Sequence, residues 1–308
     1  MLFPEHSILI VGKLTSSLDV DLNSNYCVFY SSDISAESPL EDVELCNSIS
    51  GVVVAFDACF PFGWLDYLPN LRVISSVGFG LGRFPVDECS RRGISLYDTS
   101  SAMTECVADY ALGLILAESR SLFHADKYLR DGPITGISFM RTSRVSGKRL
   151  GIFGLGRVGC AIAERAPAFN MYISYHDLQP VQGVPWRYFE SLMSMADWCD
   201  FLVISVPLTS GTKSIVDFEV LRRLGSSGVL VNISHSNIVV EAHLIRALQD
   251  GSLGGAALDV YDSTNPLPQA LAAIDRVILS PRVAGITEES TESMLVLALE
   301  NLRMGLET

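Results

Sequence analysis

The sequence has few charged residues, and basic residues are the scarcer kind. Of its 308 residues 19% are charged, and 22 Lys and Arg against 35 Asp and Glu give a formal net charge of −13. No run of five basic residues occurs, so the chain lacks the basic patch typical of nucleic-acid binding. With 48% apolar residues the chain is predicted to fold, and its length allows two domains with substantial cores.

Paired cysteines and long hydrophobic segments are also missing. No two of the cysteines have C-x-x-C spacing, and their number is odd: Cys27, Cys46, Cys59, Cys89, Cys106, Cys160 and Cys199. This pattern predicts buried free thiols in a reducing compartment, and no metal site is expected. The longest apolar stretch, 108–117, contains Asp109 and falls well short of the roughly 20 residues of a membrane span. The first residues lack the basic region of a signal peptide, so we expect a cytoplasmic protein without membrane contact.

One stretch carries a nucleotide-binding pattern. The apolar run 150–153 predicts a buried strand, and a helix-like pattern follows the motif G-x-G-x-x-G formed by Gly154, Gly156 and Gly159. Gly154 permits a tight turn, Gly156 lets the backbone approach a pyrophosphate, and Gly159 lets the helix pack against the strand. The N-terminus of that helix offers N–H groups and the positive end of its dipole to phosphates.

An acidic residue follows where such a motif needs one. A second short strand, 171–175, is followed by Asp177, which lies 18 residues after Gly159 (177 − 159 = 18). A carboxylate there accepts hydrogen bonds from the adenosine ribose hydroxyls and repels a 2′-phosphate, so we expect NAD in preference to NADP. Strand, glycines, helix, strand and acid occur in order, which favours a dinucleotide site over an ordinary loop.

Strands alternate with helices along the chain. Parallel strands are predicted at 7–12, 52–55, 72–76 and 93–98, and again at 201–205, 228–232, 255–260 and 277–280. We therefore expect an α/β protein with two Rossmann-like, doubly wound parallel-sheet domains and a cleft between them. A flavodoxin-like substrate domain is expected at 1–98 plus 286–308, and a NAD-binding Rossmann domain at 99–285.

A long helix is predicted between the two halves. The helical pattern opens at Thr104 and runs to about Arg130, and its apolar residues cover more than one face. Such a helix is buried between domains or against another subunit. We interpret it as a bridging helix and expect a homodimer.

Together these stretches resemble the D-isomer-specific 2-hydroxyacid dehydrogenase family over nearly the whole chain. V-G-F-G at 77–80 is similar to the family's substrate loop, whose backbone amides hold a carboxylate, and A-L-D-V at 257–260 is similar to the segment whose aspartate contacts the nicotinamide amide. The helix opening at 104–109 and the strand and loop at 200–209 also match. The resemblance implies hydride transfer between nicotinamide and a small anionic 2-oxo or 2-hydroxy acid. It implies cofactor contacts from Thr104, Gly154, Gly156, Arg157, Val158, Gly159, Asp177, Pro207, Thr212, Ile233, Ser234 and Asp259, and substrate contacts from Val77, Gly78 and Phe79.

The family's three catalytic residues, an Arg, a Glu and a His, are all replaced in this chain. His235 stands in the place of the arginine, and Arg282 in the place of the histidine. Asn265 takes the place of the glutamate, with one apparent extra residue before it. In the family the histidine supplies the proton, the glutamate raises the pKa of that histidine, and the arginine binds the carboxylate. Asn265 has no ionisable group, and an arginine does not release a proton near neutral pH.

Three interpretations remain open. In the first the roles are exchanged: His235 is the acid, Arg282 binds an anionic substrate, and Asp262 tunes the pKa of His235. In the second another group or water protonates a different anionic substrate, such as a phosphonate or an imine. In the third the chain is a catalytically silent NAD(H)-binding sensor or scaffold. The sequence favours an NAD-dependent oxidoreductase acting on CH–OH groups, with a rebuilt active site.

Overall fold

Two compact units make up the molecule. The computed structural model describes residues 6–14, 22–31, 43–56, 58–78, 80–82, 84–132, 142–261 and 269–307. The first unit comprises residues 1–103 and 286–308, and the second comprises residues 104–285. The boundary that the sequence suggests after residue 98 differs from this division, because the 3-10 helix η3, Ser100–Met103, packs on the last helix of the first unit.

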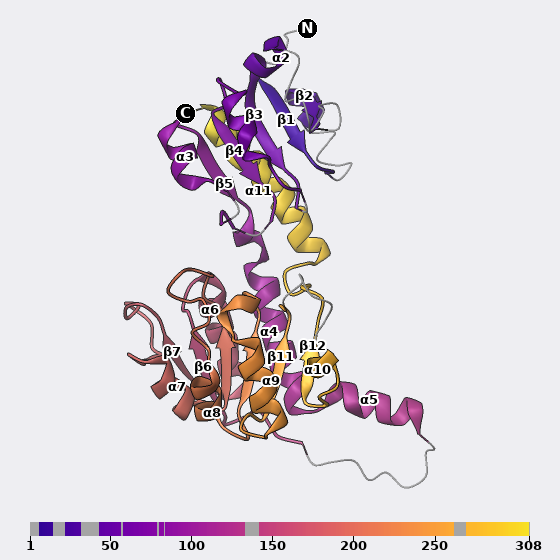
Figure 1. The fold of residues 1–308 in the computed structure, drawn as a ribbon, viewed down its shortest axis with the longest axis vertical. Coiled ribbons are helices and arrows are strands. Elements are labelled where there is room, and N and C mark those ends of the chain that lie inside the picture. Colours follow the sequence, from indigo (N-terminus) through magenta and orange to yellow (C-terminus); the bar gives the residue numbers. More distant parts are fainter. Residues whose placement is uncertain are drawn as a thin grey trace. The chain divides into compact units, whose positions relative to one another are not determined.

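The first unit contains a five-stranded parallel sheet (Figure 1). Its strands lie in the order β2-β1-β3-β4-β5, which is the 2-1-3-4-5 order of flavodoxin-like folds. The other strands were expected, but β2 was not, because it is a short edge strand whose residues are half-buried or exposed. The elements are β1 (Ser7–Val11), β2 (Cys27–Tyr30), α2 (Val43–Ser48), β3 (Ile49–Val54), η2 (Phe62–Asp66), β4 (Val73–Ser76), α3 (Val86–Arg91), β5 (Ser95–Asp98), η3 and α11 (Glu288–Glu307).

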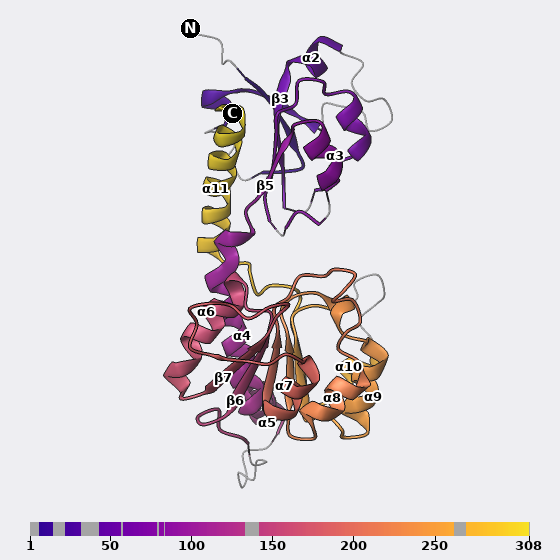
Figure 2. The same ribbon diagram turned by 90° about the vertical axis from the view of Figure 1, so that its left-hand side faces the viewer.

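Helices cover both faces of this first sheet. Buried apolar side chains of β1, β3 and β4 pack against α2, η2 and α3 on one face. On the other face α11 runs along the strands (Figure 2). Ser75 Oγ donates to the Ala298 carbonyl of α11 at 2.9 Å, and a Cβ at Gly305 would lie only 2.4 Å from Val73. The last helix of the chain therefore belongs to the first unit.

The second unit contains seven parallel strands in the order β12-β11-β10-β9-β6-β7-β8. The order reverses between β6 and β9, so a ligand is expected outside the carboxyl ends of these two strands. Both sheets are parallel and carry helices on both faces, which confirms the predicted α/β fold class. The elements are α4 (Thr104–Ser119), α5 (Leu122–Asp131), β6 (Arg149–Phe153), α6 (Arg157–Arg165), η4 (Ala166–Phe169), β7 (Tyr172–His176), β8 (Arg187–Tyr188), α7 (Leu192–Trp198), β9 (Phe201–Ile204), α8 (Phe218–Leu224), β10 (Val229–Asn232), η5 (Ser236–Ile238), α9 (Glu241–Gln249), β11 (Gly255–Leu258), α10 (Gln269–Ala272) and β12 (Val277–Leu279).

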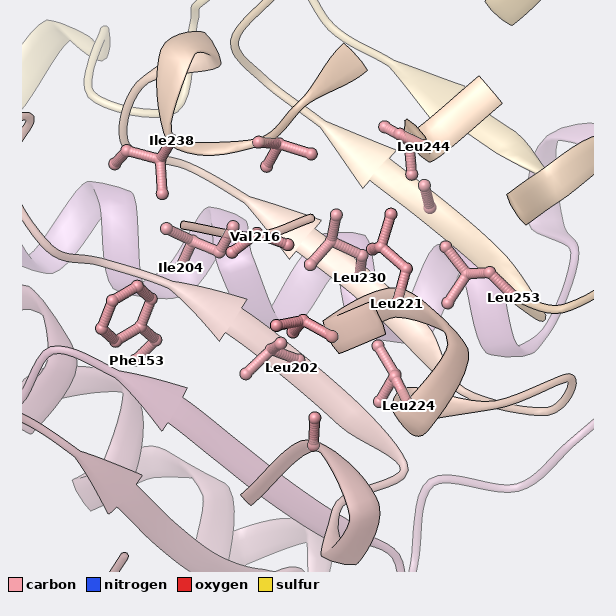
Figure 3. Packing of buried hydrophobic residues seen from close by; sticks show 14 of the residues in the cluster. Phe153, Leu202, Ile204, Val216, Leu221, Leu224, Leu230, Ile238, Leu244 and Leu253 are labelled. Atoms are coloured by element: carbon pink, nitrogen blue, oxygen red, sulfur yellow. The ribbon is translucent and has the colours of Figure 1, made fainter. Parts of the chain in front are cut away.

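Alternate residues of the second sheet are buried on opposite faces. On one face Phe153, Leu202 and Leu230 pack with Leu221 of α8 and Leu244 of α9 (Figure 3). On the other face α4 and α6 cover the remaining residues of the same strands. Burial on both faces explains why the central strands read as continuous apolar runs.

The prediction of one long helix from residue 104 to 130 is wrong. α4 ends at Ser119, and Ser121 has a left-handed φ of 48° before α5 begins at Leu122. A left-handed residue interrupts a right-handed helix. α4 is buried as its apolar pattern predicts, whereas no residue of α5 is buried in the part of the chain that the structure describes.

The cysteines are free thiols, as predicted, but not all are buried. Cys46, Cys89 and Cys199 are buried, whereas Cys27 lies exposed at the start of edge strand β2 and Cys59 is exposed in the loop before η2. The expectation of burial is therefore wrong for these two thiols, and Cys106 and Cys160 are only half-buried. No helix among the described residues is long and apolar enough to cross a membrane.

Candidate nucleotide and substrate site

The glycine motif lies between β6 and α6, where the strand order of the second sheet reverses. Gly154 has a φ of 96°, and a Cβ there would lie 2.5 Å from Val206 Cγ1, so only glycine fits. A Cβ at Gly159 would lie 2.1 Å from the Gly154 carbonyl oxygen, so α6 packs directly on the end of β6. A Cβ at Gly156 would meet nothing within 4 Å. The only one of the three glycines with open space beside it is thus the one expected to face a pyrophosphate.

The N-terminus of α6 has the features of an anion site. Gly156 is the N-cap residue, and no side chain caps the helix. The first turn therefore presents backbone N–H groups and the positive end of the helix dipole. Arg157 is exposed and Val158 is half-buried in this turn. These features fit the phosphates of a dinucleotide.

Asp177 directly follows β7 and holds the glycine loop. Its Oδ2 accepts the Leu155 N–H at 2.8 Å, and its Oδ1 accepts the Leu178 N–H at 2.7 Å. Leu155 is the residue between the first two glycines of the motif. The carboxylate is half-buried, and two bonds leave acceptor positions for further hydroxyl donors. Asp177 thus combines a structural task with the position expected of a ribose-binding acid.

Hydroxyl groups fix the loop that follows β9. Thr212 Oγ1 donates to the Pro207 carbonyl at 2.7 Å, which closes the loop, and Pro207 itself is exposed. Ser205 Oγ donates to the Gly154 carbonyl at 2.7 Å and so joins this loop to the glycine turn. Sequence reasoning missed Ser205, although a polar residue directly after a buried apolar strand is a usable signal.

A buried asparagine organises the loop that follows β10. Asn232 is 1% exposed; its Oδ1 accepts the Ser234 N–H and its Nδ2 donates to the His235 carbonyl, both at 3.1 Å. Ser234 Oγ donates to the Val206 carbonyl. Ile233, which lies between Asn232 and Ser234 in the sequence, is half-buried. Asn232 also was missed, and it sets the path of the chain up to His235.

The imidazole ring of His235 has a fixed orientation and a defined tautomer. Its Nδ1 accepts the Asn237 N–H at 3.2 Å, so the neutral ring carries its proton on Nε2. Burial lowers the pKa of His235, and the positive charge of Arg282 lowers that pKa further. At pH 7 His235 is therefore a neutral hydrogen-bond donor through Nε2.

Arg282 lies after β12, in a segment held by Asp259 from the end of β11. Asp259 is 3% exposed. Its carboxylate accepts hydrogen bonds from Ser280 Oγ at 2.6 Å, the Val283 N–H at 3.0 Å and the Ala284 N–H at 2.9 Å. Between these donors Arg282 has a left-handed φ of 60°. Both oxygens of Asp259 thus bind protein groups, beyond the nicotinamide contact expected of it.

The carboxyl edge of the second sheet gathers most of the expected site. β10, β11 and β12 are parallel neighbours, so His235, Asp259 and Arg282 follow their ends at the edge that also carries the glycine motif. Thr104 is the first residue of α4. Asn265, which the sequence assigns to the glutamate's place, lies outside the described residues, as does Asp262.

The expected substrate loop directly follows β4 in the first unit. The Val77 N–H donates to the Val54 carbonyl at 2.9 Å, and the Gly78 N–H donates to Thr99 Oγ1 at 2.8 Å. Both amides thus have hydrogen-bond partners within the first unit, and these two hydrogen bonds fix the conformation of the loop. Phe79 lies outside the described residues.

Comparison with known proteins identifies the family. The model of the D-isomer specific 2-hydroxyacid dehydrogenase, NAD binding domain, matches residues 112–284. The chain belongs to the D-isomer-specific 2-hydroxyacid dehydrogenase family. The resemblance drawn from the sequence motifs is confirmed, and the chain is a member of a family of NAD-binding oxidoreductases.

Named relatives within this dehydrogenase family are reductases. The chain is 41% identical over 256 residues to glyoxylate/hydroxypyruvate reductase A of Arabidopsis thaliana, with 83% of this chain and 82% of that protein covered. It is 36% identical over 295 residues to hydroxyphenylpyruvate reductase of Plectranthus scutellarioides, with 96% and 94% covered. Among solved structures, the NADPH-dependent glyoxylate/hydroxypyruvate reductase of Sinorhizobium meliloti has a TM-score of 0.87 at 32% identity, with 98% and 95% covered.

Proposed function

We propose that the chain is an NADH-dependent reductase of a small anionic 2-oxo acid in which two catalytic roles are exchanged. The observation that carries this proposal is one pair of residues at the same sheet edge. His235 holds a proton on Nε2, and the cationic Arg282 is close enough to affect the pKa of His235. A hydrogen-bond donor for the carbonyl and a cation for the carboxylate are the two groups that the reaction needs.

The cofactor part of the proposal rests on the glycine turn. The open space at Gly156 and the uncapped N-terminus of α6 suit a pyrophosphate, and Asp177 suits ribose hydroxyls. When bound, a nicotinamide nucleotide supplies the hydride. Because the carboxylate of Asp177 repels a 2′-phosphate, NADH is proposed over NADPH, although the Sinorhizobium relative is NADPH-dependent. The dissociation constants of NADH and NADPH, for this chain and for Asp177→Ser, test that preference.

The substrate part of the proposal assigns one task to each residue. Arg282 carries a permanent positive charge that binds the substrate carboxylate. His235 donates its Nε2–H to the carbonyl oxygen, and a neutral imidazole can polarise a carbonyl without first being protonated. When the carbonyl is reduced, the Nε2 proton of His235 would pass to the developing alkoxide, and the resulting imidazolate would take a proton back from solvent at Nε2. The named relatives point to 2-oxo acids such as glyoxylate, hydroxypyruvate and hydroxyphenylpyruvate as the first candidates.

The assembly part of the proposal is a cytoplasmic homodimer in which α5 contacts the second copy. Four large apolar side chains of α5 are between 45% and 61% exposed: Leu122, Phe123, Tyr128 and Leu129. A helix with this much exposed apolar surface and no buried residue gains stability by covering that surface. A copy of the same chain is the occupant we propose.

The decisive experiment follows NADH oxidation by absorbance across a panel of 2-oxo acids. We expect His235→Ala to lower kcat by roughly 10²–10⁴-fold, the usual range for a proton-transfer group. Arg282→Ala is expected mainly to raise KM for the oxo acid. His243→Ala is the matched control, because His243 Nδ1 also accepts a backbone N–H, that of Phe218 at 3.1 Å, outside the site. Tight NADH binding without turnover of any 2-oxo acid would overturn the proposal.

A catalytically silent NAD(H)-binding sensor or scaffold is the second candidate. The observation that favours it is the replacement of all three family catalytic residues beside an intact glycine motif. A sensor is expected to change its shape or partner binding with NADH while oxidising none. Turnover that depends on His235 would exclude this candidate.

A further inference from the structure

We propose that Asp259 is a positioning residue that holds Arg282 in its working conformation and fixes its spacing from His235. This inference rests on the proposed function, because Arg282 matters to the reaction only if it binds the substrate anion. It goes beyond the expected contact of Asp259 with the nicotinamide amide, since it assigns the carboxylate to the protein's own loop.

The bonding of the Asp259 carboxylate is the first argument. An ionised carboxylate has about four acceptor positions, and three of them are occupied here by Ser280, Val283 and Ala284. Since the residue is 3% exposed, such a charge is tolerated only when protein donors replace water. The three donors all belong to the segment after β12, so the buried charge is used to organise that segment.

The backbone of Arg282 is the second argument. A left-handed conformation is unfavourable for any residue with a Cβ and persists only where the surroundings impose it. Arg282 has this conformation, with a φ of 60°, and the donors to Asp259 lie on both sides of it in the sequence. The residue under strain is thus the one that carries the substrate-binding charge.

The position of Asp259 between two loops is the third argument. Its own N–H donates to the Asn232 carbonyl at 3.0 Å, and Asn232 in turn donates to the carbonyl of His235. The side chain of Asp259 holds the segment that contains Arg282. This segment begins at Ser280, whose N–H donates to the Leu258 carbonyl at 3.0 Å. Main chain and side chain of one residue therefore connect the two proposed catalytic groups.

Hydrogen exchange tests the structural half of this inference without any substrate. In Asp259→Asn the amide Nδ2 donates instead of accepting, so at least one of the three bonds is lost. The single oxygen of asparagine can keep only one of the two amide acceptors, so we expect at least one of the Val283 and Ala284 amides to exchange about tenfold faster than in the unchanged protein. Asp217→Asn is the matched control: Asp217 caps α8 by accepting the Glu219 N–H at 3.0 Å, and asparagine caps equally well. Unchanged exchange at residues 283 and 284 in Asp259→Asn would overturn the inference.

Kinetics test its functional half. Loss of a charge-assisted hydrogen bond corresponds to roughly a 10–100-fold effect, so Asp259→Asn is expected to raise KM for the oxo acid by this factor. Because Asp259 is also the expected contact of the nicotinamide amide, KM is measured at saturating NADH, so that weaker cofactor binding does not contribute to the rise. Combined with Arg282→Ala, the substitution is expected to add little, because both act through the same group. Fully additive effects would show that Asp259 acts independently of Arg282.

The two readouts keep this inference distinct from the proposed function. If the unchanged protein neither turns over a 2-oxo acid nor binds the non-reducible analogue oxamate with NADH, the proposed function fails, and with it the role of Arg282. If turnover is found but Asp259→Asn leaves KM and hydrogen exchange unchanged, only the positioning role fails. Should Asp259→Asn not fold, Ser280→Ala removes a single donor, and a smaller rise in the same KM is expected.

Discussion

Alanine at two glycines of one motif is expected to separate folding from nucleotide binding. In Gly159→Ala the new Cβ would lie 2.1 Å from the Gly154 carbonyl oxygen, whereas ordinary contacts begin at 3.4 Å. α6 must then move by about 1.3 Å (3.4 − 2.1 = 1.3) away from β6. Because the opposing atom belongs to the backbone, little relaxation is available, and overpacking of this kind costs about 1–3 kcal/mol of folding free energy.

Gly156→Ala is expected to behave in the opposite way. Its φ of −76° suits alanine, and nothing lies within 4 Å of the new Cβ. The free energy of unfolding should therefore change by less than about 0.5 kcal/mol. The methyl group would nevertheless occupy the space proposed for the pyrophosphate, so we expect NADH affinity to fall by roughly tenfold, or about 1.4 kcal/mol.

Urea unfolding and NADH fluorescence titration measure the two quantities independently. Gly63→Ala in η2 is the control, since its Cβ also meets nothing within 4 Å and it lies in the other unit. Unchanged NADH affinity in Gly156→Ala would refute the assignment of the pyrophosphate to this turn. Unchanged stability in Gly159→Ala would refute the close packing of α6 on β6.

Four further outcomes are expected. Because burial lowers the pKa of His235 below its usual 6.5, a pH–rate profile of kcat/KM should decline on the acid side with a midpoint below pH 6.5. Burial raises the pKa of Glu118, so the folded state binds this proton more tightly than the unfolded state, and the free energy of unfolding falls as pH rises above 4.5. Glu118→Gln should therefore raise the urea midpoint at pH 7. Thr99→Val removes the acceptor of the Gly78 N–H and should cost about 1–3 kcal/mol by thermal unfolding. Leu129→Glu on exposed α5 should convert the proposed dimer to a monomer in sedimentation analysis.

The sequence predicts those parts of the fold that depend on residues close together in the chain. The strands of the second sheet are buried on both faces, so each shows as an apolar run, and the glycine motif follows the first of them directly. The break at Ser121 is different, because serine at φ 48° has no distinctive local signal. Edge strands β2 and β8 are short and partly exposed, and they lack the apolar run that identifies a central strand.

The hydrogen bonds that hold the site were beyond sequence reasoning for a different reason. Thr99 and Gly78 are 21 residues apart, and Asp259 and Ala284 are 25 apart. Which residues form such hydrogen-bonded pairs depends on which strands become neighbours in the sheet. The residues next to each partner in the sequence do not reveal the pairing. Asn232 had a local signal, a polar residue ending an apolar strand, yet its two partners depend on the turn that follows it.

Under the proposed function, the replacements at the family's catalytic positions amount to a single change. In the family arrangement, a glutamate raises the pKa of a histidine that then delivers a proton. Here Nδ1 of His235 accepts the Asn237 N–H, and a protonated imidazolium could not accept this hydrogen bond because its Nδ1 carries a proton. Burial and the charge of Arg282 both lower the pKa of His235. Under the proposed function His235 works as a neutral donor and needs no carboxylate beside it, which agrees with the presence of Asn265 in the sequence where the family has a glutamate. In the same proposal Arg282 supplies the positive charge from the loop after β12, and the hydrogen bonds of Asp259 to Val283 and Ala284 hold that loop.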